Sequence, residues 1–178
     1  GSINASEKGF FYGEGWGQGT DSSTPGGGAY GGFAGSGYTG TVTGTAGGVT
    51  YGSITAPTDL GSGAGLRSSW GGKGGGAIQI AVSGTLTVNG TIAADGEDVD
   101  VVGGSNWGGG SGGSVYLDVG TLAGTGRVAA DGGSSNGAGG SGGGGRIALL
   151  YATDSSTLAT LSAYGGMTTD TTPDSPTL

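Results

Sequence analysis

The chain has 178 residues, of which 50 are glycine, and carries a formal net charge of −8 with five lysines and arginines in total. It contains neither cysteine nor histidine, which excludes disulfides, His or Cys metal centres, Ser-His triads and thiol nucleophiles. The shortage of basic residues argues against nucleic acid and anionic membranes as partners, and the chain lacks the run of about 18 apolar residues that a membrane span requires.

A seven-residue unit opens the chain and returns three times. The four copies are Gly1–Glu7, Gly90–Gly96, Gly126–Gly132 and Ala159–Gly165. Each copy has alanine at its fifth position and an aliphatic residue at its third, in the order Ile3, Ile92, Val128 and Leu161. Apolar residues at every second position predict a short strand with one inward face. Because the chain opens directly on a copy, we expect a mature or excised segment.

Residues 9–76 separate the first two copies and hold most of the aromatic residues, nearly all of them beside glycine. The later copies begin only 36 and 33 residues apart. We therefore expect this stretch to be an insertion between successive repeating layers of strands, or rungs. An ordered meander whose aromatic side chains pack on the repeats is the expected structure. Disorder and an aromatic surface displayed for a ligand are the alternatives.

A longer apolar segment precedes each of the last three copies, at Ala77–Val82, Ser114–Val119 and Arg146–Tyr151. Aligning these segments predicts shared columns of apolar residues. The columns are Ile78, Val115 and Ile147; Ile80, Leu117 and Leu149; Val82, Val119 and Tyr151; and, in a short further segment, Leu86, Leu122 and Leu158. We expect sharp corners with positive φ at five glycines, namely Gly84, Gly90, Gly120, Gly124 and Gly126.

These repeats predict an all-β fold in which parallel strands of successive rungs stack about 4.8 Å apart. The expected architecture is a glycine-rich parallel β-helix, or solenoid, with long glycine-rich loops at Glu97–Gly113 and Gly133–Gly145. A flattened β-sandwich built from the same strands is the alternative. We expect one domain over residues 1–166, which includes the insertion at 9–76, followed by a Thr- and Pro-rich tail or linker at 167–178.

Several carboxylates lie close together in the sequence or one repeat apart: Asp95, Glu97, Asp98, Asp100 and Asp131. Solvated acids at turns are the favoured interpretation, and a calcium site is the alternative because calcium accepts flexible oxygen ligands. The spacing matches neither an EF-hand nor a glycine-rich calcium nonapeptide. Asp95 and Asp131 could also approach the 5–5.5 Å of a retaining glycosidase pair. The scarcity of basic residues that would steer acidic sugars argues against that, and we predict no catalytic residues.

Aromatic residues offer a candidate carbohydrate platform. Trp16, Trp70, Trp107 and Tyr116 are the candidates. The favoured alternative is that these residues pack over the rungs. Two sequons, at Asn4 and Asn89, would accept glycans in a eukaryotic secreted protein.

The sequence resembles a known class of repeat module. The run Gly-Gly-Gly-Ala-Ile-Gln-Ile-Ala-Val-Ser-Gly-Thr-Leu-Thr-Val-Asn-Gly-Thr-Ile-Ala-Ala-Asp-Gly at Gly74–Gly96 is similar to the glycine-rich β-helical modules of large secreted and cell-surface adhesin-like proteins, mostly bacterial. The likeness covers Gly1–Phe10 and Gly71–Gly166. It implies a secreted or cell-surface, non-enzymatic spacer or adhesive element, for which no functional residues are defined.

The expected function is therefore that of a non-catalytic extracellular structural or adhesive module. Because both ends carry rung-like copies, self-assembly end to end into a fibre is an extension of this hypothesis. The expected partners are other copies, neighbouring domains of a larger secreted protein, and glycans. The alternative function is a lectin-like domain that uses the glycine-flanked aromatics.

Overall fold

The computed structural model describes residues 1–38, 44–99 and 106–169. Within these ranges the chain forms strands and no helix. The strands are β1 (Ser2–Asn4), β2 (Ala77–Thr87), β3 (Thr91–Ala93), β4 (Ser114–Gly124), β5 (Arg127–Ala129), β6 (Ser135–Asn136), β7 (Arg146–Ser156), β8 (Thr160–Ser162) and β9 (Thr168–Thr169). The prediction of an all-β chain with parallel strands is thus confirmed for this part of the chain.

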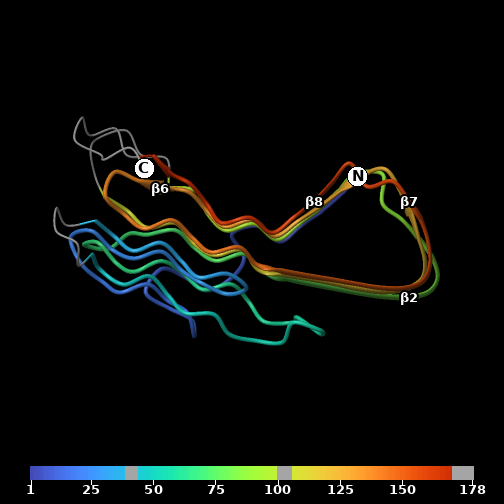
Figure 1. Ribbon diagram of the computed structural model, residues 1–178, viewed down its shortest axis with the longest axis horizontal. Helices are drawn as coiled ribbons and strands as arrows, with labels where there is room; N and C mark the ends of the chain where they lie inside the picture. Colours follow the sequence, from blue (N-terminus) through green and yellow to red (C-terminus); the bar gives the residue numbers. More distant parts are fainter. Residues whose placement is uncertain (39–43, 100–105, 170–178) are drawn as a thin grey trace.

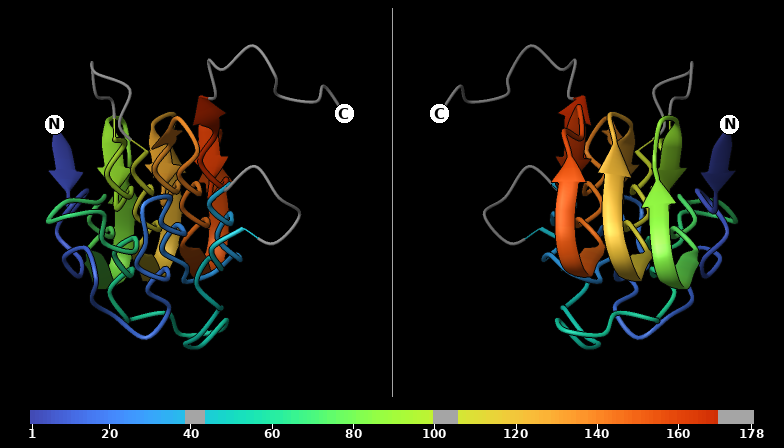
Figure 2. Two further views of the ribbon diagram at one scale, coloured as in Figure 1. Left: turned by 90° about the vertical axis from the view of Figure 1, so that its left-hand side faces the viewer. Right: turned by 90° about the vertical axis from the view of Figure 1, so that its right-hand side faces the viewer.

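The strands form three parallel sheets. Their orders are β1-β3-β5-β8, β2-β4-β7 and β6-β9. Viewed along the stack, successive turns of the chain follow almost the same path, running along a long strand, bending and returning through a short one (Figure 1). The long strands lie side by side, and β1 lies beyond β2 at one end of the stack (Figure 2).

The register of the short strands agrees with the repeat. Ile3 pairs with Ile92, Ile92 with Val128, and Val128 with Leu161. The three predicted columns of the long strands pair in the same way, for example Ile80 with Leu117 and Leu117 with Leu149. An alternation of period two fixes this register, because a slip of one residue would turn every aliphatic side chain to the other face.

The apolar core lies between the long and the short strands. Its buried members are Ile78, Val88, Ile92, Ala94, Val115, Leu117, Val119, Leu122 and Val128. The middle layer, β4 and β5, is the most deeply buried, with Leu117 and Val128 fully covered. In β7 most residues are exposed because no strand lies beyond it among the described residues. Burial therefore follows the position of a strand in the stack.

One predicted column is wrong at its last member. Leu122 pairs with Asp154, and Leu158 lies after the end of β7. The predicted column aligned Leu122 with Leu158, which lies four positions beyond its true partner Asp154. An alignment on leucine alone therefore slips by four residues, because the repeat from β4 to β7 is shorter than the spacing of these leucines. Leu158 still packs against the core as a partly buried residue.

The predicted glycine corners are also wrong in part. Gly84 and Gly120 lie inside the eleven-residue strands β2 and β4, which bend along their length (Figure 1), and the ladder shifts register between Val82 and Thr85, but neither glycine has a positive φ. Of the five expected positions, Gly124 alone has a positive φ, of 107°. At Gly126 the requirement is space, because a Cβ there would lie within 3.0 Å of the Gly90 carbonyl oxygen.

The glycine-rich segments form a second hydrogen-bonded body beside the strands. Residues 108–114 lie at its centre, and their backbone N–H groups donate in a pattern of period three. Gly109 and Gly112 donate to Gly140 and Gly143, Gly110 and Gly113 donate to Glu97 and Ala94, and Ser111 and Ser114 donate to Ser62 and Gly76. Three residues per turn is the period of the polyproline II helix, which has no internal hydrogen bonds and offers all its N–H groups to neighbours. This pattern indicates a bundle of extended, threefold segments, which we call the glycine bundle.

Close packing explains why glycine is needed in this bundle. Besides the segments that accept its N–H groups, the central segment accepts hydrogen bonds from Gly28 and Gly133 on two further segments. A Cβ at Gly109, Gly110 or Gly112 would lie within 3.0 Å of a carbonyl oxygen in a neighbouring segment. Backbone groups thus satisfy one another where no apolar side chain is present to form a core.

The stretch 9–76 joins the glycine bundle through its described residues rather than forming further long strands. Tyr30 is fully buried, its ring centroid lies 4.8 Å from that of Tyr51, and its hydroxyl accepts a hydrogen bond of 2.8 Å from Ser114 on β4. Arg146 on β7 lies 5.4 Å from the Tyr30 ring and donates to the Tyr51 carbonyl at 2.8 Å. Burial raises the pKa of Tyr51 to about 12. Buried tyrosines therefore tie this stretch to the long strands.

Candidate functional site

Four aromatic side chains from three glycine-rich segments form a continuous row, which we call the aromatic strip: Phe11, Tyr12, Trp70 and Trp107. Phe11 and Trp70 are exposed, and Tyr12 and Trp107 are half-buried. The backbone positions the strip. Ala64 N–H donates to the Gly72 carbonyl at 2.9 Å, and Gly72 N–H donates to Gly108 at 2.9 Å. Because these residues carry little or no side chain, the segments lie close enough for rings on neighbouring segments to meet.

The rings of the strip contact one another in sequence. Tyr12 and Trp70 are stacked, with centroids 6.2 Å apart and planes at 19°. Trp107 follows at 6.0 Å from Trp70, and Phe11 meets Tyr12 edge-on at 6.1 Å. Trp70 is 53% and Phe11 is 55% exposed. Pairs of this geometry stabilise one another beyond the area they bury, which holds the exposed rings in place.

A tight turn presents Trp70. Ser68 has φ of 61°, and Arg67 N–H donates to the Trp70 carbonyl at 3.0 Å to close the turn. At the Phe11 end of the strip, the Lys73 ammonium lies 5.7 Å from the Phe11 ring centroid and 3.8 Å from the Glu97 carboxylate. The strip thus offers flat apolar faces with one cation and one carboxylate beside them. This combination suits a ligand that has both C–H faces and hydroxyl groups.

Two of the four aromatic residues predicted from the sequence come together here, namely Trp70 and Trp107. Trp16 is highly exposed, and Tyr116 lies on β4 between Gln79 and Ala148. Neither joins a ring contact recorded in the described part of the chain. Sequence reasoning missed Phe11 and Tyr12 as members. Their signal was the same as for Trp70, an aromatic residue within a glycine-rich segment, but adjacency between segments does not follow from it.

The predicted acidic residues form a ladder along the stack. Ser6 Oγ accepts the Asp95 N–H at 3.0 Å, Asp95 Oδ1 accepts the Asp131 N–H at 2.7 Å, and Asp131 Oδ1 accepts the Tyr164 N–H at 2.8 Å. Asp98 Oδ1 likewise accepts the Ser134 N–H at 2.6 Å. Each polar side chain therefore binds the backbone of the next layer, so the ladder links successive layers.

The other oxygens of these acids also have partners. Asp131 Oδ2 accepts from Arg127 and from Ser162, each at 2.8 Å, and Asp95 Oδ2 lies 4.0 Å from the same guanidinium. Glu97 accepts the Lys73 N–H at 2.9 Å. Asp100, also considered for calcium, lies outside the described residues. Within those residues, no group of three or more acids is arranged to hold a metal ion.

The ladder has a testable pH dependence. Burial raises the pKa of Asp95 above its ordinary value of 3.8, and the Asp131 carboxylate raises it further. Between that value and the raised pKa the folded chain binds more protons than the unfolded chain, so stability falls as the pH rises through this window. Asp95→Asn keeps an oxygen for the Asp131 N–H but cannot ionise. We compare the melting temperature of Asp95→Asn with that of the wild type at each pH. We expect the variant's melting temperature minus that of the wild type to be larger at neutral pH than below pH 3.8. A melting-temperature difference that is the same at both pH values would contradict this assignment.

In the part of the chain that the structure describes, no helix has the length and apolar character needed to cross a bilayer. Comparison with protein-family models, with curated proteins and with solved structures finds no match. The features of the molecule that bear on function are the aromatic strip, the acidic ladder and the stack itself.

Proposed function

We propose that this chain is a glycine-rich β-solenoid that serves as a non-catalytic structural and adhesive module of a larger extracellular assembly. The observation that carries this proposal is the inward column of the short strands. Exposure along the column is 48% at Ile3, 4% at Ile92, zero at Val128 and 52% at Leu161. An aliphatic column that is buried in the middle and exposed in its first and last layers is typical of a solenoid stack, in which each layer covers its neighbours.

The repeats support an extracellular place for the module. Its resemblance to secreted adhesin-like repeats rests on the same residues that pair in register, such as Ile92 and Val128. The expected neighbours are further repeats or domains of the same assembly.

The two ends of the stack favour a spacer over a fibre of identical copies. Among the described residues, no strand lies beyond β7 or β8 at one end of the stack, whereas at the other end β1 lies beyond β3 and no strand lies beyond β2. If β8 of one copy paired with β1 of the next, a gap one long strand deep would remain between β7 and β2. Direct stacking of copies therefore leaves backbone groups unpaired.

Sedimentation velocity and negative-stain electron microscopy over a wide concentration range test the spacer role. We expect a monomer at every concentration because the two ends do not match. Filaments that grow with concentration would overturn the spacer role and favour the fibre. The matched variant is Leu161→Lys, which places a charge on the open end of the column and would suppress such filaments.

The aromatic strip favours glycan binding as a second function. Stacked, exposed rings held on a rigid backbone are suited to the C–H faces of sugars. We expect Trp70→Ala to weaken binding on a glycan array about tenfold, equivalent to roughly 1.4 kcal/mol. Trp16→Ala is the matched control, because that ring is exposed and lies outside the strip. Equal binding by both variants would remove the strip from the mechanism.

A further inference from the structure

The stack ends in a slot beside β1. In the short-strand sheet β1 forms the layer beyond β3, but in the long-strand sheet no described strand lies beyond β2. Figure 2 shows the outer side of β2 bare, with β1 projecting past it. Because neighbouring strands lie about 4.8 Å apart, the slot is one strand deep. It has the length of β2, which is eleven residues.

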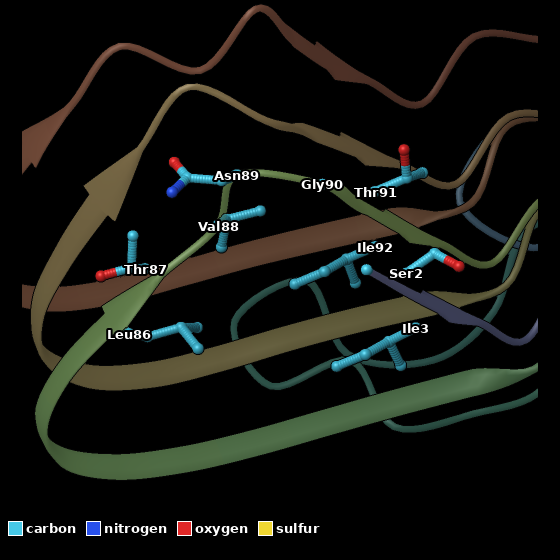
Figure 3. Close-up of a pocket in the computed structure, with 10 residues that line it drawn as sticks. Ser2, Ile3, Leu86, Thr87, Val88, Asn89, Gly90, Thr91 and Ile92 are labelled. Carbon is cyan, nitrogen blue, oxygen red and sulfur yellow. The ribbon is translucent and has the colours of Figure 1, made fainter.

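Apolar side chains line the end of this slot. Ile3, Leu86 and Ile92 point into the space between β1 and the bend that follows β2, whereas Thr87 and Asn89 point away (Figure 3). A groove of about 370 Å³ opens there. Ile80 and Val82 in β2 remain only partly buried, although their counterparts Leu117 and Val119 in β4 are buried. The slot thus lacks the side chains that cover the next layer.

We propose that this slot binds one parallel, eleven-residue β-strand that carries branched aliphatic residues opposite Ile78, Ile80, Val82 and Leu86. The inference rests on the solenoid proposed above and names its docking partner. An unpaired sheet edge recruits an extended strand through backbone hydrogen bonds, and pockets for alternate side chains set its sequence. The occupant extends the existing ladder of β2, β4 and β7 by one strand.

The existing strands define what fits. β4 lies against β2 in parallel and presents Val115, Leu117 and Val119 to the interior. A strand on the other side of β2 meets the same interior at the same spacing, so the same alternation suits it. A second copy of this chain does not supply the strand readily. Its free long strand, β7, is followed by β8, which would occupy the layer where β1 already lies.

A labelled peptide with the sequence of Ser114–Gly124 tests the proposal on the full chain by fluorescence anisotropy. The control peptide has the same composition with its apolar residues moved by one position, which turns them away from the interior. We expect the first peptide to bind at least about tenfold more tightly than the control, since a slipped strand loses its buried face.

A fusion tests the same slot from within one chain. Ser2 and Arg127 both pair with Thr91, on opposite sides of β3, so Gly1 takes the place of Gly126 in the repeat. Residues 114–125 fused before Gly1 should therefore enter the slot. We expect the melting temperature to rise by about 5 °C or more, which is a measurable gain for a chain of this size, and peptide binding to be lost.

The proposal would be overturned by equal binding of both peptides, by unchanged peptide binding to the fused chain, or by a fused chain whose melting temperature equals that of the unfused chain. Self-association of the unfused chain that the peptide reverses would assign the slot to β7 of a second copy and would also overturn it. The stacked core is tested separately by Leu117→Ala below. If the slot binds no strand, the solenoid proposal is unaffected. If Leu117→Ala shows that the stacked core is absent, the solenoid proposal is wrong.

Discussion

Gly112→Ala is expected to destabilise the chain by about 3 kcal/mol, at the upper end for overpacking. Gly112 lies in the central segment of the glycine bundle and donates to the Gly143 carbonyl at 3.0 Å. A Cβ at this position would lie within 3.0 Å of backbone atoms of Ala130 and Gly145. Neither atom can rotate away, so one of the segments has to move and break its hydrogen bonds.

Chemical denaturation followed by circular dichroism measures this loss, and two other glycines provide controls. A Cβ at Gly84 meets nothing within 4 Å, and one at Gly165 finds its nearest atom at 3.6 Å. Alanine at either control position is expected to change the free energy of unfolding by about 0.5 kcal/mol or less. If Gly112→Ala changes the free energy of unfolding no more than the control variants do, the glycine bundle is not the close-packed body described above.

Leu117→Ala is expected to cost about 2–5 kcal/mol of unfolding free energy, the range for a large cavity in a rigid core. Leu117 is fully buried in β4, the middle long strand. It pairs with Ile80 on one side and Leu149 on the other. Strands fixed on both sides cannot collapse into the space that the leucine leaves, which favours the higher part of the range.

Leu150→Ala is the matched control for that cavity. Leu150 lies on the outermost long strand, pairs with Asp118 and is 40% exposed. Its truncation removes a similar volume but leaves no enclosed cavity, so we expect a loss of about 1 kcal/mol or less. Equal losses at the two positions would show that the columns do not form the core.

The strand register could be predicted from sequence because side-chain alternation and strand geometry share a period of two. Ile92 and Val128 are 36 residues apart, yet they pair as the repeat requires. The slip at Leu158 has a different origin. The alignment used leucine identity, whereas the register at Leu122 depends on the length of the connection that precedes β7.

The glycine bundle could not be predicted in the same way. Its period of three is carried by backbone N–H groups, and glycine has no side chain whose alternation would reveal it. Among 50 glycines, spacings of two and three both occur by chance. The aromatic strip depends on this bundle, since Tyr12 and Trp107 meet through Trp70 only because their segments lie side by side.

Disulfide formation in this cysteine-free chain shows whether the parallel layers are in register. Ala81 and Asp118 are exposed partners on adjacent long strands, whereas Leu150 lies one strand further along the same row. Adjacent strands bring Cα atoms within the roughly 4.4–6.8 Å that a disulfide spans, and strands two apart do not. We predict that the double variant A81C/D118C oxidises to an intrachain disulfide and that A81C/L150C stays reduced. A disulfide in the second pair and not in the first would contradict the stacked arrangement.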